Sequence, residues 1–332
     1  MSVFIIAEIS ANHNNDLDLA LKTVQAAIDS GADAIKVQTF KPESLALDVD
    51  NEIFGPKKQG AWKGWRPWDL YQKAALPYEW HIPIKELVES SGKVFFSSPF
   101  DLDAVDFLES LKVPLYKIAS FEINDIPLIS KVASTGKPII ISTGVAGLDE
   151  IEQAVEACHF ANNFDITLLK CTSEYPAKIS EANLNKMLDL KKRFPVKVGL
   201  SDHSEGFIVP IVATSLGAEV IEKHFILDRS NGGLDSVFSM EPAEFSQMVD
   251  LVRSSEKALG NVSYDVSEND QYRKRSLFAI SPIRRGEVFT AENVKSLRPN
   301  IGLAPLNYYE IINKKATQNI EVGAPLKQEH IE

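Results

Sequence analysis

The sequence predicts an α/β fold, a TIM (β/α)8 barrel, because eight short apolar runs alternate with eight helix-like stretches. The apolar runs are nearly continuous, as expected for parallel strands that are covered on both faces. An open, doubly wound sheet is the runner-up, but no GxGxxG motif follows the first run. The predicted strands are 3–9, 33–39, 93–97, 113–118, 138–142, 165–170, 196–200 and 219–224. The predicted helices are 17–30, 79–91, 101–111, 124–135, 148–161, 181–193, 206–217 and 242–258.

Two segments depart from this alternation. Residues 40–78 form a long insertion after the second predicted strand, and long loops in compact domains are often functional. Its tryptophans either stack on a sugar ring or build a small core beneath the loop. After residue 260 the pattern ends, and short strand and turn signals follow. We therefore expect a barrel over 1–260, a linker over 261–275 and a small domain over 276–332. The tryptophans in question are Trp62, Trp65, Trp68 and, just beyond the insertion, Trp80.

Composition narrows the class of protein. The chain has 332 residues, is 44% hydrophobic and 24% charged, and carries a net charge of -11. That charge argues against a nucleic-acid or anionic-membrane surface, although a small anionic substrate remains compatible. Cys158 and Cys171 lack disulfide or metal spacing, the N-terminus lacks a basic signal region, and no apolar run approaches membrane-spanning length. We expect a cytoplasmic protein.

Two histidines end consecutive predicted strands. His203 closes the run 196–204, and His224 closes the run 218–225. Neighbouring strands lie about 4.8 Å apart, so the two rings can meet. Neutral imidazoles suit Mn²⁺, Zn²⁺, Fe²⁺ or Co²⁺, and water and substrate would complete such a site. The alternative is a pair of buried histidines with ordinary hydrogen bonds. Asp202 and Glu222 stand beside them and could orient the rings.

Polar residues also end most of the other predicted strands, where a TIM barrel carries its active site. Lys36, Lys117 and Lys170, with nearby hydroxyls, suit a phosphate or a carboxylate. The alternatives are lysines that extend to solvent, or one lysine that forms a Schiff base with a carbonyl substrate. Glu8 is a candidate general base, a ligand for a hydroxyl group, or a partner for one of the lysines. The remaining polar strand ends include Gln38, Ser97, Ser98, Ser120, Thr143 and Thr172.

Several segments in order resemble the sialic acid synthases. They include IIAEISANHNND (5–16), DAIKVQTF (33–40), YKIASFEIND (116–125), LLKCTSEYPA (168–177), GLSDHSEG (199–206) and VIEKHF (220–225). The C-terminal part looks like the antifreeze-like (SAF) domain of that family. KGWRPWDLYQKAALPYEWH (63–81) and DSVFSMEP (235–242) are similar to the branch of the family that makes pseudaminic acid.

The resemblance implies that phosphoenolpyruvate condenses with an open-chain amino sugar, a 2,4-diacetamido-2,4,6-trideoxy hexose of the altrose type. It implies that His203 and His224 bind a divalent metal ion, Mn²⁺ first and Mg²⁺ or Co²⁺ otherwise. Glu8 would act with them as a catalytic residue. It also implies a domain-swapped homodimer, in which Arg298 reaches the partner's sugar. The implied substrate-binding residues are Lys36, Gln38, Lys117, Ser120, Thr143, Thr172, Ser173, Tyr175, Ser201, Asp202, Glu222 and Arg298.

Two positions depart from the family pattern. Many relatives carry Asn at the position of Ser173, and many carry Gly after the Arg298–Pro299 pair, where this chain has Asn300. Alternatives therefore stay open. They are an N-acetylneuraminic or legionaminic acid synthase, a Schiff-base aldolase, and a sugar-binding protein without catalysis.

Overall fold

The structure, a computed structural model, describes residues 2–60 and 62–332. The chain divides into two compact units, one that ends at Gly260 and one that begins at Asn261. Across the described ranges, no helix combines the length and the apolar character that crossing a membrane requires.

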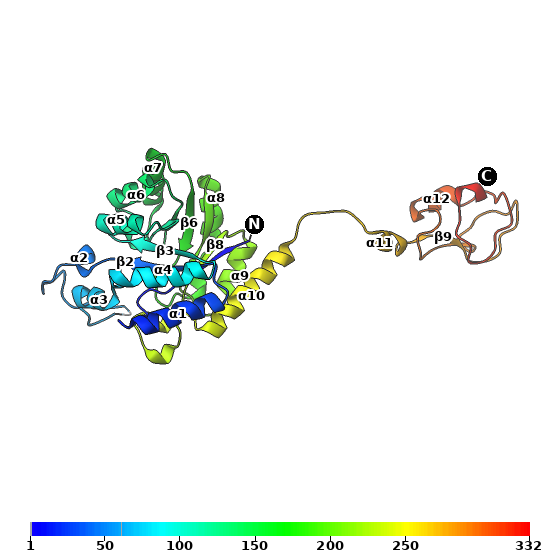
Figure 1. Cartoon of the computed structure of the whole chain (residues 1–332). Coiled ribbons are helices and arrows are strands. Elements are labelled where there is room, and N and C mark those ends of the chain that lie inside the picture. The colour runs from blue at the N-terminus through cyan, green and yellow to red at the C-terminus, as the bar shows by residue number, and fades with distance from the viewer. Residues whose placement is uncertain (1, 61) are drawn as a thin grey trace. The chain divides into compact units, whose positions relative to one another are not determined.

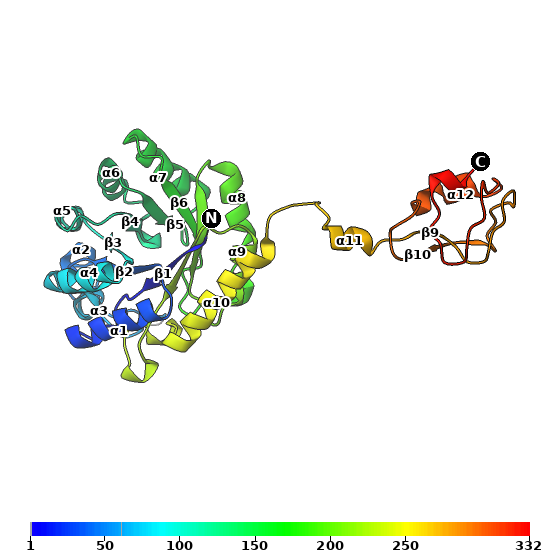
Figure 2. The same cartoon turned by 45° about the vertical axis from the view of Figure 1, so that its right-hand side comes forward.

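The first unit is a closed barrel of eight parallel strands in sequential order, β1 to β8, which confirms the predicted fold class. Each strand pairs with its neighbours in the chain, and β8 closes the barrel against β1. Figures 1 and 2 show the strands inside a ring of helices. The strands are β1 (Phe4–Glu8), β2 (Ala34–Thr39), β3 (Val94–Pro99), β4 (Tyr116–Ile118), β5 (Ile139–Ser142), β6 (Ile166–Cys171), β7 (Lys197–Asp202) and β8 (Val220–His224).

The helices that surround the barrel begin where the sequence supplies caps. The side chains of Asp16, Asp101 and Asp125 each accept a backbone N–H in the first turn of a helix. Pro242 starts the last barrel helix, where its missing N–H has no cost. The helices are α1 (Leu17–Asp29), α4 (His81–Ser90), α5 (Leu102–Ser110), α6 (Ile126–Ser134), α7 (Leu148–Phe160), α8 (Asn185–Arg193), α9 (Ile208–Ser215) and α10 (Pro242–Leu259).

The barrel interior changes from apolar to charged along the strands. Its lower layer is a buried cluster that includes Ile6, Ala34, Phe96, Leu169 and Val220. Because side chains alternate along a strand, the residues two positions further on also face inward. Those positions hold Glu8, Lys36, Ser98, Cys171 and Glu222, and two more residues lead to Gln38 and His224. The inward face therefore carries charge at the C-terminal mouth of the barrel.

The insertion after β2 folds over this mouth. It contains the short helices α2 (Pro42–Leu45) and α3 (Pro67–Ala74), each begun by a proline. A buried hydrogen-bond chain ties the end of the insertion to the barrel wall. Thr39 Oγ1 lies 2.7 Å from His81 Nε2 and 2.6 Å from Ser97 Oγ. Burial lowers the pKa of His81 to about 4, so this ring is neutral at pH 7.

The second unit has its own apolar core, which includes Leu277, Phe289, Ile311 and Leu326. Its strands β9 (Ser276–Ala279) and β10 (Val294–Leu297) pair in the antiparallel sense. It also contains the short helices α11 (Glu268–Tyr272) and α12 (Tyr308–Ile311). Helix α11 lies within residues 261–275, the predicted linker.

Candidate active site

Four ionisable side chains of alternating sign occupy the inward face of the barrel beneath its mouth. Lys36 Nζ lies 2.6 Å from Glu8 Oε2 and 3.4 Å from Glu222 Oε1, and Lys117 Nζ lies 3.9 Å from Glu222 Oε1. None of the four residues is more than 4% exposed. Buried charges are tolerated only when they are paired. The four side chains therefore either neutralise one another or neutralise a charged ligand that binds among them.

The two carboxyl groups have different proton affinities. Burial raises the pKa of Glu8 to about 7, although Lys36 acts in the opposite direction. Burial also acts on Glu222, but Lys117 and Lys36 outweigh it and lower the pKa of that group. A site with one ionised carboxylate and one group that titrates near neutral pH has the arrangement used for general acid–base catalysis.

Hydroxyl groups surround the two lysines. Lys117 Nζ donates to Ser142 Oγ at 2.6 Å, and the Gly144 N–H donates to Ser120 Oγ at 3.1 Å. A Cβ at Gly144 would lie 2.2 Å from Ser173 Oγ and 2.8 Å from Ser120 Oγ, so this close approach requires glycine. Lysines and converging hydroxyls form a setting suited to a phosphate or a carboxylate.

Two neighbouring hydroxyls complete this side of the mouth. Ser201 Oγ lies 3.5 Å from Glu222 Oε1, and Thr143 Oγ1 donates to the Leu169 carbonyl at 3.0 Å. Both residues are buried. The structure therefore brings Lys36, Lys117, Ser120, Thr143, Ser173 and Ser201 to one region, while their contact with a substrate stays a prediction.

The histidine rings meet at the same mouth, with centroids 5.1 Å apart. His203 Nδ1 lies 2.9 Å from the Thr172 carbonyl, and a neutral ring that donates there keeps its Nε2 lone pair available. Burial lowers the pKa of His224 well below its ordinary value. Its Nδ1 is buried and has no hydrogen-bond partner among the described residues. Two aromatic rings pack against the pair. The centroid of the Tyr175 ring lies 4.4 Å from that of His203, and the centroid of the Phe238 ring lies 5.0 Å from that of His224.

This donor set fits a divalent metal ion, because two imidazoles lie close together and one buried ring nitrogen lacks a partner. Among residues 2–60 and 62–332, no cluster of three or more His, Cys, Asp or Glu side chains has a metal-binding arrangement. An ion at the histidines would therefore depend on water and substrate for its other ligands. Burial opposes a charge on His203, but Cys171 outweighs it and raises its pKa, so a proton competes with a metal there.

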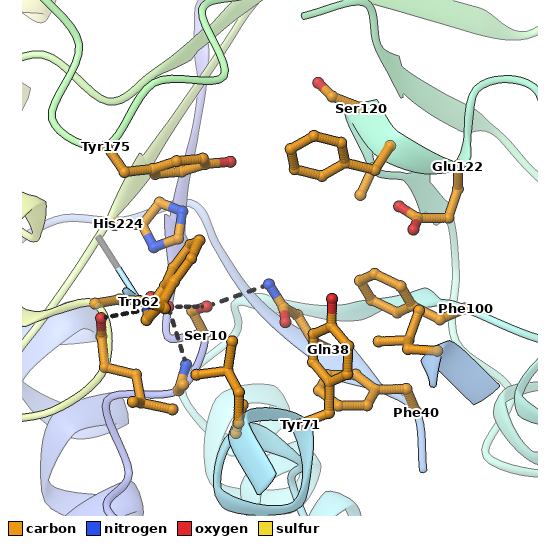
Figure 3. Close-up of a pocket in the computed structure, with 18 of the residues that line it drawn as sticks. Ser10, Gln38, Phe40, Trp62, Tyr71, Phe100, Ser120, Glu122, Tyr175 and His224 are labelled. Atoms are coloured by element: carbon orange, nitrogen blue, oxygen red, sulfur yellow. Dashed lines mark hydrogen bonds between the residues drawn. The ribbon is translucent and has the colours of Figure 1, made fainter. Parts of the chain in front are cut away.

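A pocket of about 310 Å³ opens above these residues. Figure 3 shows His224, Tyr175 and Trp62 on one side, with Phe40, Tyr71 and Phe100 facing them and Gln38 between the two sides. The insertion supplies Trp62 and Tyr71. The pocket is large enough for a small sugar derivative and connects the histidines to an apolar wall.

Comparison with known proteins identifies this arrangement. The model of the NeuB family matches residues 23–264, and the model of the SAF domain matches residues 274–332. The chain belongs to the NeuB family. The family match covers the barrel unit, including every strand that supplies the mouth except β1. The SAF match covers the strands of the second unit.

Individual members of the NeuB family are similar to this chain over most of its length. The chain is 47% identical to pseudaminic acid synthase of Campylobacter jejuni (strain 81-176), over 98% of this chain and 96% of the relative. It is 39% identical to an N,N'-diacetyllegionaminic acid synthase of Campylobacter jejuni (strain NCTC 11168), over 95% and 96%. A solved sialic acid synthetase from Leptospira borgpetersenii in complex with citrate has a TM-score of 0.72 and 34% identity, over 82% of this chain and 90% of that one.

Two predicted residues of this NeuB-family chain do not point into the mouth. Asp202 forms a buried ion pair with Lys223 Nζ at 2.5 Å. Thr172 contacts Lys170 and donates to the Glu181 carbonyl at 3.3 Å. Alternation explains both, because Ser201 and Ser173, their neighbours in sequence, face inward. A direct substrate contact for Asp202 or Thr172 stays a prediction, as does the role of Arg298 in the second unit.

Polar residues that were not predicted also line the pocket, among them Ser10, Glu122 and Asp235. Ser10 Oγ donates to Asp235 Oδ2 at 2.5 Å and accepts from Gln38 Nε2 at 3.2 Å. Glu122 is largely buried, its Oε2 has no partner among the described residues, and burial raises its pKa to about 7. Glu122 lies only a few residues beyond β4, so the strand-end argument could have found it. Asp235 lies eleven residues after His224 in a loop that no periodicity predicts.

The four tryptophans have different surroundings, and stacking on a sugar ring stays a prediction. Trp62 lines the pocket and donates Nε1–H to the Leu234 carbonyl at 3.1 Å. Trp80 packs against the barrel core, and Lys73 lies over the ring of the exposed Trp65. Trp68 lines a separate surface groove. Of these rings, only Trp62 is placed to meet a pocket ligand.

Proposed function

We propose that the chain condenses phosphoenolpyruvate with a 2,4-diacetamido-2,4,6-trideoxy hexose of the altrose type, giving pseudaminic acid and phosphate. The observation that carries this proposal is the mouth itself, where a buried lysine and hydroxyl cluster lies beside a pair of histidines. The 47% identity to a pseudaminic acid synthase supports the choice of substrates.

Lys36 and Lys117 bind the charged groups of phosphoenolpyruvate, with Ser120, Ser173 and the Gly144 backbone around them. Both lysines are buried, so their charges act in a medium of low dielectric and hold the anion strongly. Their positions on β2 and β4 are fixed by the barrel, which orients the enol carbon toward the histidines. Such fixed positioning lowers the entropic part of the barrier.

The chemical step forms one carbon–carbon bond. The π electrons of the enol attack the aldehyde carbon, and the aldehyde oxygen takes up a proton. Water adds to the resulting cationic carbon and gives its proton to Glu8, whose pKa of about 7 suits a general base at neutral pH. The carbon–oxygen bond to phosphate then breaks, phosphate leaves with the bonding electrons and takes the hydroxyl proton of that carbon, and a ketone remains.

His203 and His224 would hold a divalent ion, with Mn²⁺ first and Mg²⁺ or Co²⁺ as alternatives. Such an ion would supply a Lewis acid for the aldehyde oxygen. The Tyr175 and Phe238 rings exclude water from one side of the histidines. We further propose a homodimer in which Arg298 of one subunit serves the site of the other, acting in the cytoplasm.

A second candidate function is a Schiff-base aldolase. One observation favours it, because burial lowers the pKa of Lys117 and so makes its amine more nucleophilic. The contacts of Lys117 with Ser142 and Glu222 argue against it, since they favour the charged ammonium. The 39% identity to an N,N'-diacetyllegionaminic acid synthase makes the sugar precursor of legionaminic acid an alternative substrate.

Metal removal separates the two mechanisms. We expect phosphate release from phosphoenolpyruvate and the diacetamido sugar to stop with EDTA and to return when Mn²⁺ is added in excess. Borohydride added with the sugar should leave the mass of the protein unchanged. A borohydride adduct on Lys117, with no phosphate released from phosphoenolpyruvate, would support the aldolase instead. Full phosphate release in EDTA would remove the metal ion from the mechanism.

A further inference from the structure

The side of the pocket opposite the histidines is aromatic. The Phe40 ring lies 6.1 Å from Tyr71 and 5.2 Å from Phe100, both edge to face. Figure 3 shows these three rings across the pocket from His224 and Tyr175. We call Phe40, Tyr71 and Phe100 the aromatic wall. A ligand whose reactive end lies at the histidines presents its other end to this wall.

Lys57 lies between the two sides of the pocket. Its Nζ is 5.1 Å from the centroid of the Trp62 ring and 5.9 Å from that of the Tyr71 ring. Trp62 in turn packs against Tyr175 at 5.7 Å on the histidine side. Backbone hydrogen bonds of 2.9 Å, from Lys57 N–H to Trp65 O and from Gly64 N–H to Lys57 O, fix the segment that carries the lysine.

The ammonium of Lys57 has unused hydrogen-bonding capacity. Within residues 2–60 and 62–332, no carboxylate lies within ion-pair distance of it, and it donates to no protein acceptor. Ring faces attract a cation but leave its N–H groups free for a better acceptor. The side chain is half-buried and lines the pocket. It is therefore poised to donate to a neutral or anionic oxygen of a ligand.

We infer that Lys57 and the aromatic wall bind the acetamido group at C4 of the sugar, an inference that rests on the proposed function. An acetamido group offers a carbonyl oxygen for the ammonium and a methyl group for the rings. In the proposed function Lys36 and Lys117 bind the anionic groups of phosphoenolpyruvate, and the histidines lie at the aldehyde of the sugar. The part of the sugar far from the aldehyde is then the ligand group that Lys57 can contact. N-Acetylmannosamine has a hydroxyl at C4 and lacks this carbonyl.

The test compares Lys57→Met with Lys58→Met, a matched variant at the exposed neighbouring lysine. We expect Lys57→Met to lower kcat/KM for the diacetamido sugar about 10- to 100-fold, as for a lost hydrogen bond to a charged group. The KM for phosphoenolpyruvate and the kinetics or inhibition constant of N-acetylmannosamine should not change. Lys57→Arg should recover part of the loss, and Lys58→Met should match the wild type.

A second variant guards against a folding defect. Tyr71→Leu removes one ring of the wall and should act in the same direction on the same substrate, with an unchanged melting temperature for both variants. An equal loss on both sugars, a rise only in the KM for phosphoenolpyruvate, or no change would overturn the inference. If the wild type turns over the diacetamido sugar, such a result leaves the proposed function standing. If the wild type turns over neither sugar, both are wrong.

Discussion

Replacing Glu8 by Gln should lower kcat by about 10²- to 10⁴-fold, the usual contribution of a general base. The wild-type rate should rise with pH through about 7, the pKa to which burial raises the Glu8 carboxyl. The Glu8→Gln variant should lose this inflection. Lys36, Lys117 and Glu222 face Glu8, and burial also raises the pKa of Glu122, which lines the same pocket, to about 7. The loss of the inflection in Glu8→Gln, together with its persistence in Glu122→Gln, is therefore what assigns it to Glu8.

The melting temperature of Glu8→Gln shows whether a loss of rate comes from unfolding. A carboxyl whose pKa is raised in the folded state favours folding below its unfolded pKa and loses that contribution as pH rises through about 7. The neutral amide of Glu8→Gln therefore should not unfold the barrel at pH 8, and Lys36 keeps Glu222 as a partner at 3.4 Å. Glu43→Gln, an exposed carboxyl on α2, should match the wild type in both rate and melting temperature. Wild-type kcat in Glu8→Gln would remove Glu8 from the mechanism.

The second large effect is expected at Lys117. Lys117→Met removes the ammonium that donates to Ser142 and faces Glu222, so phosphoenolpyruvate loses a buried cation. We expect its KM to rise at least 100-fold, consistent with about 1.5–3 kcal/mol for each hydrogen bond to a charged group. Breaking a buried ion pair also destabilises a protein by about 3–5 kcal/mol, so the melting temperature should fall.

A double variant separates binding from folding. Lys117→Met with Glu222→Gln removes both charges and should recover much of the melting temperature, because no unpaired charge is left in the barrel. The KM for phosphoenolpyruvate should stay high, since the cation is still missing. Recovery of the KM together with the melting temperature would show that Lys117 serves only the fold.

Periodicity was sufficient to predict the barrel. The predicted strand 219–224 corresponds to β8 (Val220–His224), and the predicted strand 33–39 corresponds to β2 (Ala34–Thr39). The agreement is close because each continuous apolar run is bounded by capped helices, so the order of strands and helices has few alternatives. The charged interior was predictable for the same reason. Lys36 and Glu222 follow apolar inward residues by two positions, so the alternation places them on the same face.

The same alternation places Asp202 and Thr172 on the outward face of their strands, so their contact with a substrate stays a prediction. Asp202 stands next to the inward-facing Ser201, and therefore points to the helices, where it pairs with Lys223. Pocket residues that lie in loops could not be predicted from the sequence pattern. Asp235 and Lys57 reach the pocket through irregular segments, whose course depends on tertiary contacts such as Ser10 to Asp235 rather than on local pattern.

We infer that the mouth of this NeuB-family barrel joins phosphoenolpyruvate to a diacetamido sugar. The most direct measurement is the mass and phosphate yield of the product, with Mn²⁺, phosphoenolpyruvate, and equal amounts of the altrose-type diacetamido sugar and N-acetylmannosamine. We expect one phosphate to be released for each nonulosonic acid formed, and every molecule of that acid to carry two acetamido groups. A product derived from N-acetylmannosamine alone, or no phosphate release with either sugar, would contradict it.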